Sequence, residues 1–398
     1  MKFLFIPFYK KSHQIPLLVL YYKYFRSIKG IECSFLLPNS DEYYSKLYKV
    51  NRLDFDYSPP TFKENTNYIN LKAIHPFLDN RNKVIDQYKP DVIIEDFSFD
   101  IYQYCEQRNI PVISIQRTGV FRILNPAIRN PLHVHSIEKE LINGKRFMIF
   151  RYKNYTGNSD DLTNKEYYVA KYALDLKLKN ALNPPIKIIP GIASIEKLPP
   201  FVDTKSYYFS GPLIPNDQIE ISLLGRIKAF FNENKSKKKI FLTTGLVENQ
   251  DISGIFKYLI KKEYAIATTV FPPFDVDKRC IFFNPFFPLH YISENVDLII
   301  HHCGNGIYHY PLLHLKPFIT IGTQCYDRED VAIQLQNMNI STHIPSPFDD
   351  INYMEKFMDS IEKFENGNLC NYERLKQIRN EIETTMNKFN IKTILKKL

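Results

Sequence analysis

A glycine-containing turn in the second half of the chain has the residue types that bind an anion. His302-Cys303-Gly304-Asn305-Gly306 follows an apolar run over 296–301 and precedes a helical pattern over 305–315. A strand that runs through such a turn into a helix exposes main-chain N–H groups, and glycines let an anion approach closely. His309 stands where a dinucleotide-binding fingerprint has its third glycine, so a tight turn without a ligand is an equally good interpretation.

A histidine and a carboxylate near the start of the chain could act as base and acid. His13 lies between a predicted strand and a predicted helix, and Asp96 ends a second predicted strand. The positive field at a helix N-terminus disfavours protonation of a histidine, which can then accept a proton near neutral pH. The ends of parallel strands meet at one sheet edge, so Asp96 can orient His13. For His13 alone, a surface helix cap is the simpler interpretation.

Other patterns could be read as metal ligands. The candidates are Asp54-Phe-Asp56, Asp275-Val-Asp277, His133-Val-His135 and the histidines at 301, 302, 309 and 314. A zinc site would need ligands that share a face, but His309 and His314 lie about 140° apart on a helix. We expect loop carboxylates and separate histidines, with no metal and no cofactor.

Short β-rich runs alternate with helical patterns, which is typical of parallel sheets covered by helices. Strands are expected at 2–7, 32–37, 91–95, 111–115, 239–243, 265–269, 280–284, 296–301 and 317–321. Helices are expected at about 15–28, 71–88, 98–108, 217–232, 250–262, 305–315, 328–338, 351–365 and within 371–398. The pattern predicts two doubly wound α/β domains. The prolines between 184 and 215 indicate the linker.

Composition narrows the class of protein. The 398 residues include 52 Lys and Arg, 43 Asp and Glu, 57 Tyr and Phe, and no Trp, so the aromatic core must come from Phe and Tyr. The formal charge of +9 is scattered, and the run 235–239 indicates a solvated turn rather than a nucleic-acid site. Six widely spaced cysteines favour a reduced, cytoplasmic setting. We expect no transmembrane segment and at most a peripheral membrane contact.

The order of the motifs resembles that of family 1 glycosyltransferases with the GT-B fold, above all bacterial UDP- and dTDP-sugar-dependent enzymes. The matching motifs are Ser12-His13-Gln-Ile-Pro16, Pro90 to Asp96, Ser210-Gly211-Pro212-Leu213, Phe241 to Gly245, Asn284-Pro-Phe286-Phe-Pro288-Leu289, His301 to Gly306, Pro317 and Tyr326-Asp327-Arg328. The resemblance implies an acceptor-binding domain over 1–205, a donor-binding domain over 216–375 and a helix over 376–398 that returns to the first domain. The two domains would face each other across a crevice.

The resemblance also implies roles for individual residues. His13 matches the general base and Asp96 the acid that orients it. His302 matches the residue that binds the donor diphosphate, and Gly304, Asn305, Gly306, Ile307 and Tyr308 match the phosphate turn. The remaining matches are Thr244 on the turn facing the diphosphate, Phe286 against the nucleobase, and Asp327 with Arg328 at the sugar.

Several residues depart from the family pattern. Ser12 replaces a usual glycine, and Ile307-Tyr308 replaces hydroxyl residues, which leaves the phosphate more dependent on main-chain N–H groups. Tyr310 replaces a glutamate that binds ribose, so UDP and dTDP stay open. Arg328 replaces a glutamine, and its charge favours an acidic sugar.

The function expected from this resemblance is inverting, metal-independent transfer of a sugar from a nucleotide donor to a hydroxyl of a small molecule, lipid or glycan. Nucleotide sugar is then a co-substrate. The alternatives are a nucleotide-sugar hydrolase or epimerase of the same fold and a non-catalytic GT-B-like auxiliary protein.

Overall fold

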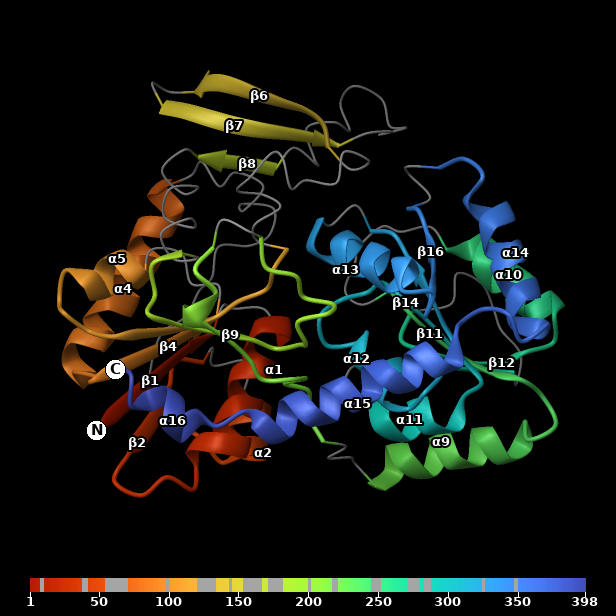
Figure 1. Cartoon of the computed structure of the whole chain (residues 1–398), viewed down its shortest axis with the longest axis horizontal. Helices are drawn as coiled ribbons and strands as arrows, with labels where there is room; N and C mark the ends of the chain where they lie inside the picture. Colours follow the sequence, from red (N-terminus) through yellow and green to blue (C-terminus); the bar gives the residue numbers. More distant parts are fainter. Residues whose placement is uncertain are drawn as a thin grey trace. The chain divides into compact units, whose positions relative to one another are not determined.

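The computed structural model (Figure 1) contains two compact units. It describes residues 1–7, 11–37, 42–53, 71–96, 101–119, 134–142, 145–152, 167–170, 182–199, 202–216, 221–244, 252–270, 279–282, 288–323, 326–346 and 350–398. Unit 1 consists of Met1–Ile214 and Thr385–Leu398, and unit 2 consists of Pro215–Thr384. Unit 1 holds a seven-stranded and a three-stranded sheet, and unit 2 holds a six-stranded sheet.

The seven strands of the first sheet are parallel and follow the order β10-β9-β5-β4-β1-β2-β3. They are β1 (Lys2–Pro7), β2 (Glu32–Phe35), β3 (Asn51–Arg52), β4 (Val92–Asp96), β5 (Val112–Ile115), β9 (Ile186–Ile189) and β10 (Tyr207–Phe209). The chain passes from β1 to β2 and β3 on one side and then returns to β4 on the other. The strand order therefore reverses between β1 and β4, the place where ligands bind in open α/β sheets.

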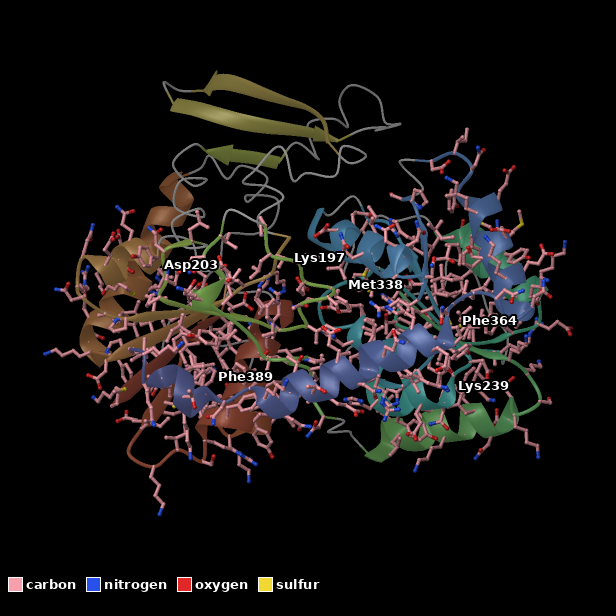
Figure 2. All side chains as sticks on the ribbon, in the orientation of Figure 1. Lys197, Asp203, Lys239, Met338, Phe364 and Phe389 are labelled. Carbon is pink, nitrogen blue, oxygen red and sulfur yellow. The ribbon has the colours of Figure 1, made fainter. Side chains whose placement is uncertain are left out.

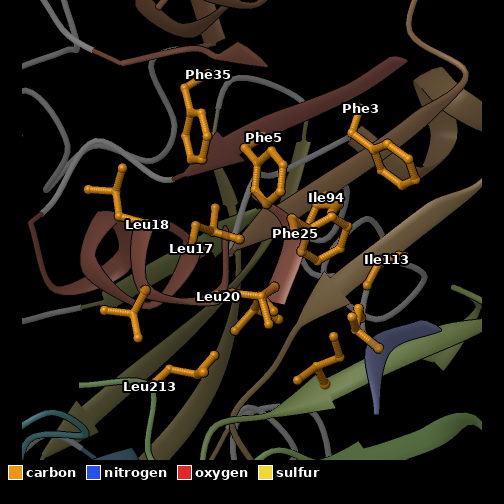
Figure 3. Packing of buried hydrophobic residues seen from close by; sticks show 14 of the residues in the cluster. Phe3, Phe5, Leu17, Leu18, Leu20, Phe25, Phe35, Ile94, Ile113 and Leu213 are labelled. Atoms are coloured by element: carbon orange, nitrogen blue, oxygen red, sulfur yellow. The ribbon is translucent and has the colours of Figure 1, made fainter. Parts of the chain in front are cut away.

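Helices cover both faces of this sheet. They are α1 (Lys11–Leu20) with a π-helical continuation (Tyr21–Phe25), α2 (Glu42–Tyr48), α4 (Leu71–Tyr88), α5 (Ile101–Glu106) and α16 (Ile391–Leu395). On one face, Phe3 and Phe5 of β1 pack against Leu17 of α1 and Phe35 of β2 (Figure 3). The rings of Phe5 and Phe35 stack with their centroids 4.4 Å apart. In a chain without tryptophan, such phenylalanines supply the aromatic core, each worth about 1.5–3 kcal/mol when fully buried.

The proline-rich segment predicted as a linker forms part of the first sheet. β9 pairs with β5, and β10 pairs with β9. The prolines flank these strands instead of interrupting them, since Pro184 and Pro185 precede β9 and Pro190 follows it. Proline lacks an N–H group for the ladder, but outside the strand it costs no ladder hydrogen bond. The linker prediction is therefore wrong for β9 and β10.

A three-stranded antiparallel sheet in unit 1 was not expected. Its strands are β6 (Val134–Ile142), β7 (Lys145–Tyr152) and β8 (Tyr167–Ala170), and β7 pairs with both neighbours. Charged residues such as Glu138, Lys139 and Glu140 are dense in β6, which hides the short-range alternation by which a half-buried strand is recognised.

The six parallel strands of unit 2 follow the order β13-β12-β11-β14-β15-β16. They are β11 (Lys239–Thr243), β12 (Ala265–Thr268), β13 (Cys280–Phe282), β14 (Leu298–His301), β15 (Phe318–Ile321) and β16 (Thr342–Ile344). The helices are α9 (Ile221–Glu233), α10 (Ser253–Lys261), α11 (Leu289–Asn295), α12 (His309–Leu313), α13 (Tyr326–Asn337) and α14 (Tyr353–Glu365). The order reverses between β11 and β14, as it does between β1 and β4 in unit 1.

The end of the chain returns to unit 1. Helix α15 (Tyr372–Lys388) begins in unit 2, and its last residues belong to unit 1 together with α16. Phe389, labelled in Figure 2, meets Tyr24 edge-on with ring centroids 5.0 Å apart. Ile391 and Ile394 join the core around β1. Among the described residues, no helix is both long and apolar enough to span a membrane.

A lysine is buried in the first sheet. Lys187 on β9 is 2% exposed, and its Nζ donates to the Pro184 carbonyl oxygen at 2.7 Å and to Ser206 Oγ at 2.9 Å. Burial lowers the pKa of Lys187 to about 8, and the charge of Asp203 acts in the opposite direction. The unfolded chain therefore binds more protons at this site than the folded chain does above about pH 8.

We expect Lys187→Met to flatten the pH dependence of stability. In the wild type, the free energy of unfolding gains about 2 kcal/mol from this group between about pH 7 and pH 9.5, because deprotonation removes the cost of a buried ammonium. Urea unfolding followed by circular dichroism at both pH values measures the difference. Lys205→Met, at an exposed position nearby, is the matched control and keeps the wild-type slope. An unchanged slope in Lys187→Met would contradict the assignment.

Candidate active site

His13 and Asp96 meet at the place where the strand order of unit 1 reverses. Asp96 is the last residue of β4, and its backbone pairs with Pro7 at the end of β1. His13 lies in the first turn of α1, which begins at Lys11 and contains Pro16, so the helix starts earlier than the predicted residue 15. His13 Nδ1 and Asp96 Oδ1 are 2.8 Å apart, and the side chains are 18% and 1% exposed.

This hydrogen bond determines which ring nitrogen can act as a base. Two acceptor atoms 2.8 Å apart would repel each other, so Nδ1 of His13 carries the proton and donates it to Asp96. The other ring nitrogen, Nε2, then has a lone pair and can take a proton. The second carboxylate oxygen, Asp96 Oδ2, is buried and has no hydrogen-bond partner within the described ranges.

A third residue at this site, Arg117, was missed from the sequence. Its Nη1 lies 3.4 Å from Asp96 Oδ1 and 3.2 Å from His13 Nδ1, and its side chain is 14% exposed. Arg117 follows β5, the strand next to β4. The available signal was its place just after a predicted strand, but its meaning depends on which strand lies next to β4.

The glycine turn of unit 2 lies at the corresponding reversal. His301 ends β14 and pairs with Thr243 at the end of β11, so His302 and the buried Thr244 follow neighbouring strand ends. The N–H groups of Ile307 and Tyr308 donate to the Gly304 carbonyl oxygen at 3.0 and 3.3 Å. These two N–H groups are therefore engaged within the turn.

The N–H groups of Gly304 and Gly306 differ from those of the next residues. No main-chain acceptor within the described part of the chain binds either of them. The predicted helix over 305–315 is shorter than expected, because residues 305–308 form a turn before α12 and Leu315 adopts a φ of 51° after it. The N–H groups of Gly304 and Gly306 are therefore candidate donors to an anion.

The two adjacent histidines have different environments. His301 is fully buried and stacks on Phe318, with ring centroids 5.4 Å apart. Burial lowers the pKa of His301 to about 3, so the ring is neutral. Its Nδ1 accepts the N–H of Cys303 at 2.9 Å, and Cys303 has the left-handed φ of 54° that non-glycine residues rarely adopt. His301 therefore stabilises the turn from within.

His302 is half-buried and lies against the turn itself. A Cβ atom at Gly304 would be 2.5 Å from His302 Nε2, so only glycine allows the ring to lie there. Burial holds the pKa of His302 well below its usual value, the charge of Arg328 and the neighbouring His301 add to the effect, and a backbone hydrogen bond to Thr243 opposes it. His302 is thus neutral, with the positive charge of Arg328 nearby.

The structure describes the side chains of only some of the other predicted site residues. Asn305 is half-buried, Ile307 is 7% exposed, and Tyr310 is 1% exposed with its ring edge-on to His290 at 4.9 Å. Asp327 lies in the first turn of α13, but its side chain is outside the described residues. Also outside them are Phe286, Asp54, Asp56, Asp275, Asp277 and His133, and the side chain of His135.

A buried network behind the start of α13 was also missed. Glu329 accepts the N–H of Thr323 at 2.6 Å through Oε1, and its Oε2 lies 2.6 Å from His343 Nε2. His343 Nδ1 lies 2.9 Å from Thr320 Oγ1. These contacts join β15, β16 and α13, and so position the helix that carries Arg328. Among the described residues, no three His, Cys, Asp or Glu side chains are grouped closely enough to bind a metal.

We expect Gly304→Ala to displace the ring of His302. The added methyl group would overlap Nε2, and the required shift costs about 1–3 kcal/mol of stability. The histidine signals in a ¹H–¹³C NMR spectrum, with His302 assigned from a His302→Gln variant, report the displacement. Gly306→Ala is the matched control, because nothing lies within 4 Å of its added Cβ atom. A His302 signal unchanged in Gly304→Ala would show that the contact does not constrain the ring.

Comparison with known proteins identifies the fold. No family model and no curated protein sequence matches the chain. A solved UDP-glucosyltransferase from Polygonum tinctorium, capable of glucosylating indoxyl, is similar over 100% of this chain and 98% of its own, with a TM-score of 0.69 and 12% identity. The glycotransferase of kitacinnamycin is similar over 100% and 99%, with a TM-score of 0.67 and 14% identity. The spinosyn rhamnosyltransferase, solved with thymidine diphosphate, covers 96% of both chains, with a TM-score of 0.60 and 13% identity. The chain therefore has the GT-B fold of these glycosyltransferases.

Proposed function

We propose that the protein is a glycosyltransferase that moves a sugar from a UDP- or dTDP-sugar to a hydroxyl group of a small molecule, lipid or glycan. The observation that carries the proposal is the hydrogen bond of 2.8 Å between His13 Nδ1 and the buried Asp96 carboxylate. It leaves Nε2 of an 18% exposed histidine as a proton acceptor, at the sheet edge where α/β folds bind ligands. The similarity to solved glycosyltransferases supports the same class of reaction.

In this proposal, His13 activates the acceptor. Nε2 takes the proton of the acceptor hydroxyl as its oxygen bonds to the anomeric carbon of the sugar. The bond between that carbon and the phosphate oxygen breaks, and the electron pair leaves with the nucleoside diphosphate. Attack opposite the leaving group inverts the anomeric centre. The negative charge of Asp96 stabilises the imidazolium that forms.

Residues of unit 2 bind the leaving diphosphate. The N–H groups of Gly304 and Gly306 donate to phosphate oxygens, and Arg328 adds a positive charge near His302. A neutral His302 can donate one hydrogen bond without repelling a cation. Donors that are already in place stabilise the negative charge as it develops on the leaving group, and such electrostatic stabilisation supplies much of the rate enhancement in many enzymes.

The remaining assignments concern the donor. Thr244 lies beside the diphosphate turn, Phe286 packs against the nucleobase, Asp327 binds sugar hydroxyls, and Asn305 and Ile307 complete the turn. The burial of Tyr310 removes it from contact with the ribose. UDP and dTDP are therefore both candidates, in keeping with a UDP-glucosyltransferase and a thymidine diphosphate complex among the similar structures. No metal takes part.

We expect His13→Ala to lower kcat by about 10²–10⁴, because general base catalysis is lost. Transfer is measured with a panel of UDP- and dTDP-sugars and hydroxyl acceptors, with and without EDTA, which should have no effect. Nucleotide binding, followed by calorimetry, is the internal control and should be the same in the variant. Arg108→Gln, which removes an exposed cation of unit 1, should keep full activity.

Three results would contradict the proposal. Transfer at the wild-type rate in His13→Ala would exclude this residue as the base. Acceptor-independent release of nucleoside diphosphate at catalytic rates would indicate a hydrolase. The absence of binding to both UDP and dTDP would exclude an enzyme that uses either donor.

A further inference from the structure

We propose that Arg117 opposes the protonation of His13 and thereby sets the lower pH limit of its action as a base. The catalytic consequence rests on the proposed function, whereas the effect on the charge of His13 does not. Arg117 is a positioning residue, since it acts through His13 and Asp96.

The geometry places one guanidinium nitrogen against both members of the pair. Arg117 Nη1 lies 3.4 Å from Asp96 Oδ1, the same oxygen that accepts the Nδ1–H of His13. It also lies 3.2 Å from His13 Nδ1. Because Nδ1 carries a proton, the guanidinium faces an N–H group. This contact becomes more unfavourable when the ring takes a second proton.

A count of charges shows which form of the ring is favoured. With Arg117 present, a neutral His13, the Asp96 carboxylate and the guanidinium together carry no net charge, and protonation of the ring makes the group positive. Without Arg117, the pair is negative when the ring is neutral, and protonation neutralises it. The Asp96 and Arg117 side chains are 1% and 14% exposed, so water screens the difference weakly. An environment of low polarity favours the uncharged arrangement.

Two other buried carboxylates of unit 1, those of Glu95 and Glu196, accept hydrogen bonds from hydroxyl groups. Asp96 reaches His13 from β4, and Arg117 reaches it from the segment after β5. Glu95, the residue before Asp96, points to the opposite face of the sheet and accepts the hydroxyl of Ser114. Glu196 accepts the hydroxyl and the N–H of Thr118. These two buried carboxylates have partners of their own, and Asp96 and Arg117 are the charged groups whose contacts with His13 the described residues establish.

The arrangement differs from a histidine paired with a carboxylate alone. Such a carboxylate stabilises the imidazolium, so the ring keeps a proton that it has accepted. Here Arg117 opposes that stabilisation, which favours a neutral ring before transfer and release of the proton afterwards. Removal of Arg117 should therefore strengthen the base while restricting it to higher pH.

The direct test follows the protonation of His13 by NMR, without donor or acceptor. The protein is labelled with ¹³C at histidine Cε1, and the His13 signal is assigned from a His13→Gln variant. In Arg117→Gln, the midpoint of the His13 titration should move up by about one to two pH units, the effect of a nearby charge. In Arg117→Lys, which keeps the charge, it should move by less than about half a unit.

Two further variants keep the test decisive. Arg108→Gln removes another arginine from unit 1, one paired with Asp86 at 2.9 Å, and should leave the His13 titration unchanged. Arg117→Met keeps the aliphatic stem and replaces Arg117→Gln if that variant does not fold. A midpoint that stays the same or moves down in both neutral variants overturns the proposal.

Kinetics then separate this proposal from a structural role. In Arg117→Gln, the acidic limb of the kcat/KM profile should move to higher pH by the same amount, while the plateau at high pH should not fall. An unmoved limb with a lower rate at every pH indicates a structural role and overturns the proposal. If the NMR midpoint moves but the wild type transfers no sugar, the proposed function fails and the role of Arg117 in the charge of His13 stands.

Discussion

The arrangement of the candidate site in unit 1 depends on the contacts of one buried carboxylate, that of Asp96. A carboxylate that is 1% exposed is unstable without partners, because it has lost its solvation. His13 and Arg117 supply a hydrogen bond and a positive charge from the ends of two other elements. The ends of β4 and β5 and the start of α1 must therefore meet for Asp96 to keep both partners. The hydrogen bond to Asp96 also fixes the tautomer of His13. The position of this carboxylate in the fold therefore decides which ring nitrogen acts as the base in the proposed reaction.

The two units use one sheet topology for two kinds of site. In each sheet the strand order reverses next to the first strand of that unit, between β1 and β4 and between β11 and β14. At such a reversal the connections leave toward opposite faces and expose the strand ends. Unit 1 places the hydrogen-bonded side chains of His13 and Asp96 there, whereas unit 2 places a glycine turn, Thr244 and His302. The difference lies in the loops, while the parallel sheets that carry them are alike.

His301 and His302 show how strand geometry separates the roles of identical neighbours. Successive side chains of a strand point to opposite sides, so the ring of His301 enters the core and that of His302 approaches the turn. Burial keeps His301 neutral by lowering its pKa, and its Nδ1 holds the N–H of Cys303 in a left-handed conformation. The strained turn then brings Gly304 against His302 so closely that a Cβ atom would not fit. The conformation of the glycine turn thus depends on a residue that is fully buried.

The sequence by itself determined the parallel strands and the order of the chemistry-bearing residues, because apolar runs and alternation are local properties that survive any later packing. It identified His13, Asp96 and the turn after His301, and the fold that they imply. Only the tertiary structure decided the rest. β9 lies in the first sheet because its backbone pairs with that of β5, and the flanking prolines lie outside the paired residues. Arg117 lies beside Asp96 because β5 pairs with β4, and the N–H groups of Ile307 and Tyr308 donate to the Gly304 carbonyl oxygen within the turn. Each of these outcomes depends on which atoms meet across the sheet or turn, and no single stretch of residues contains that information.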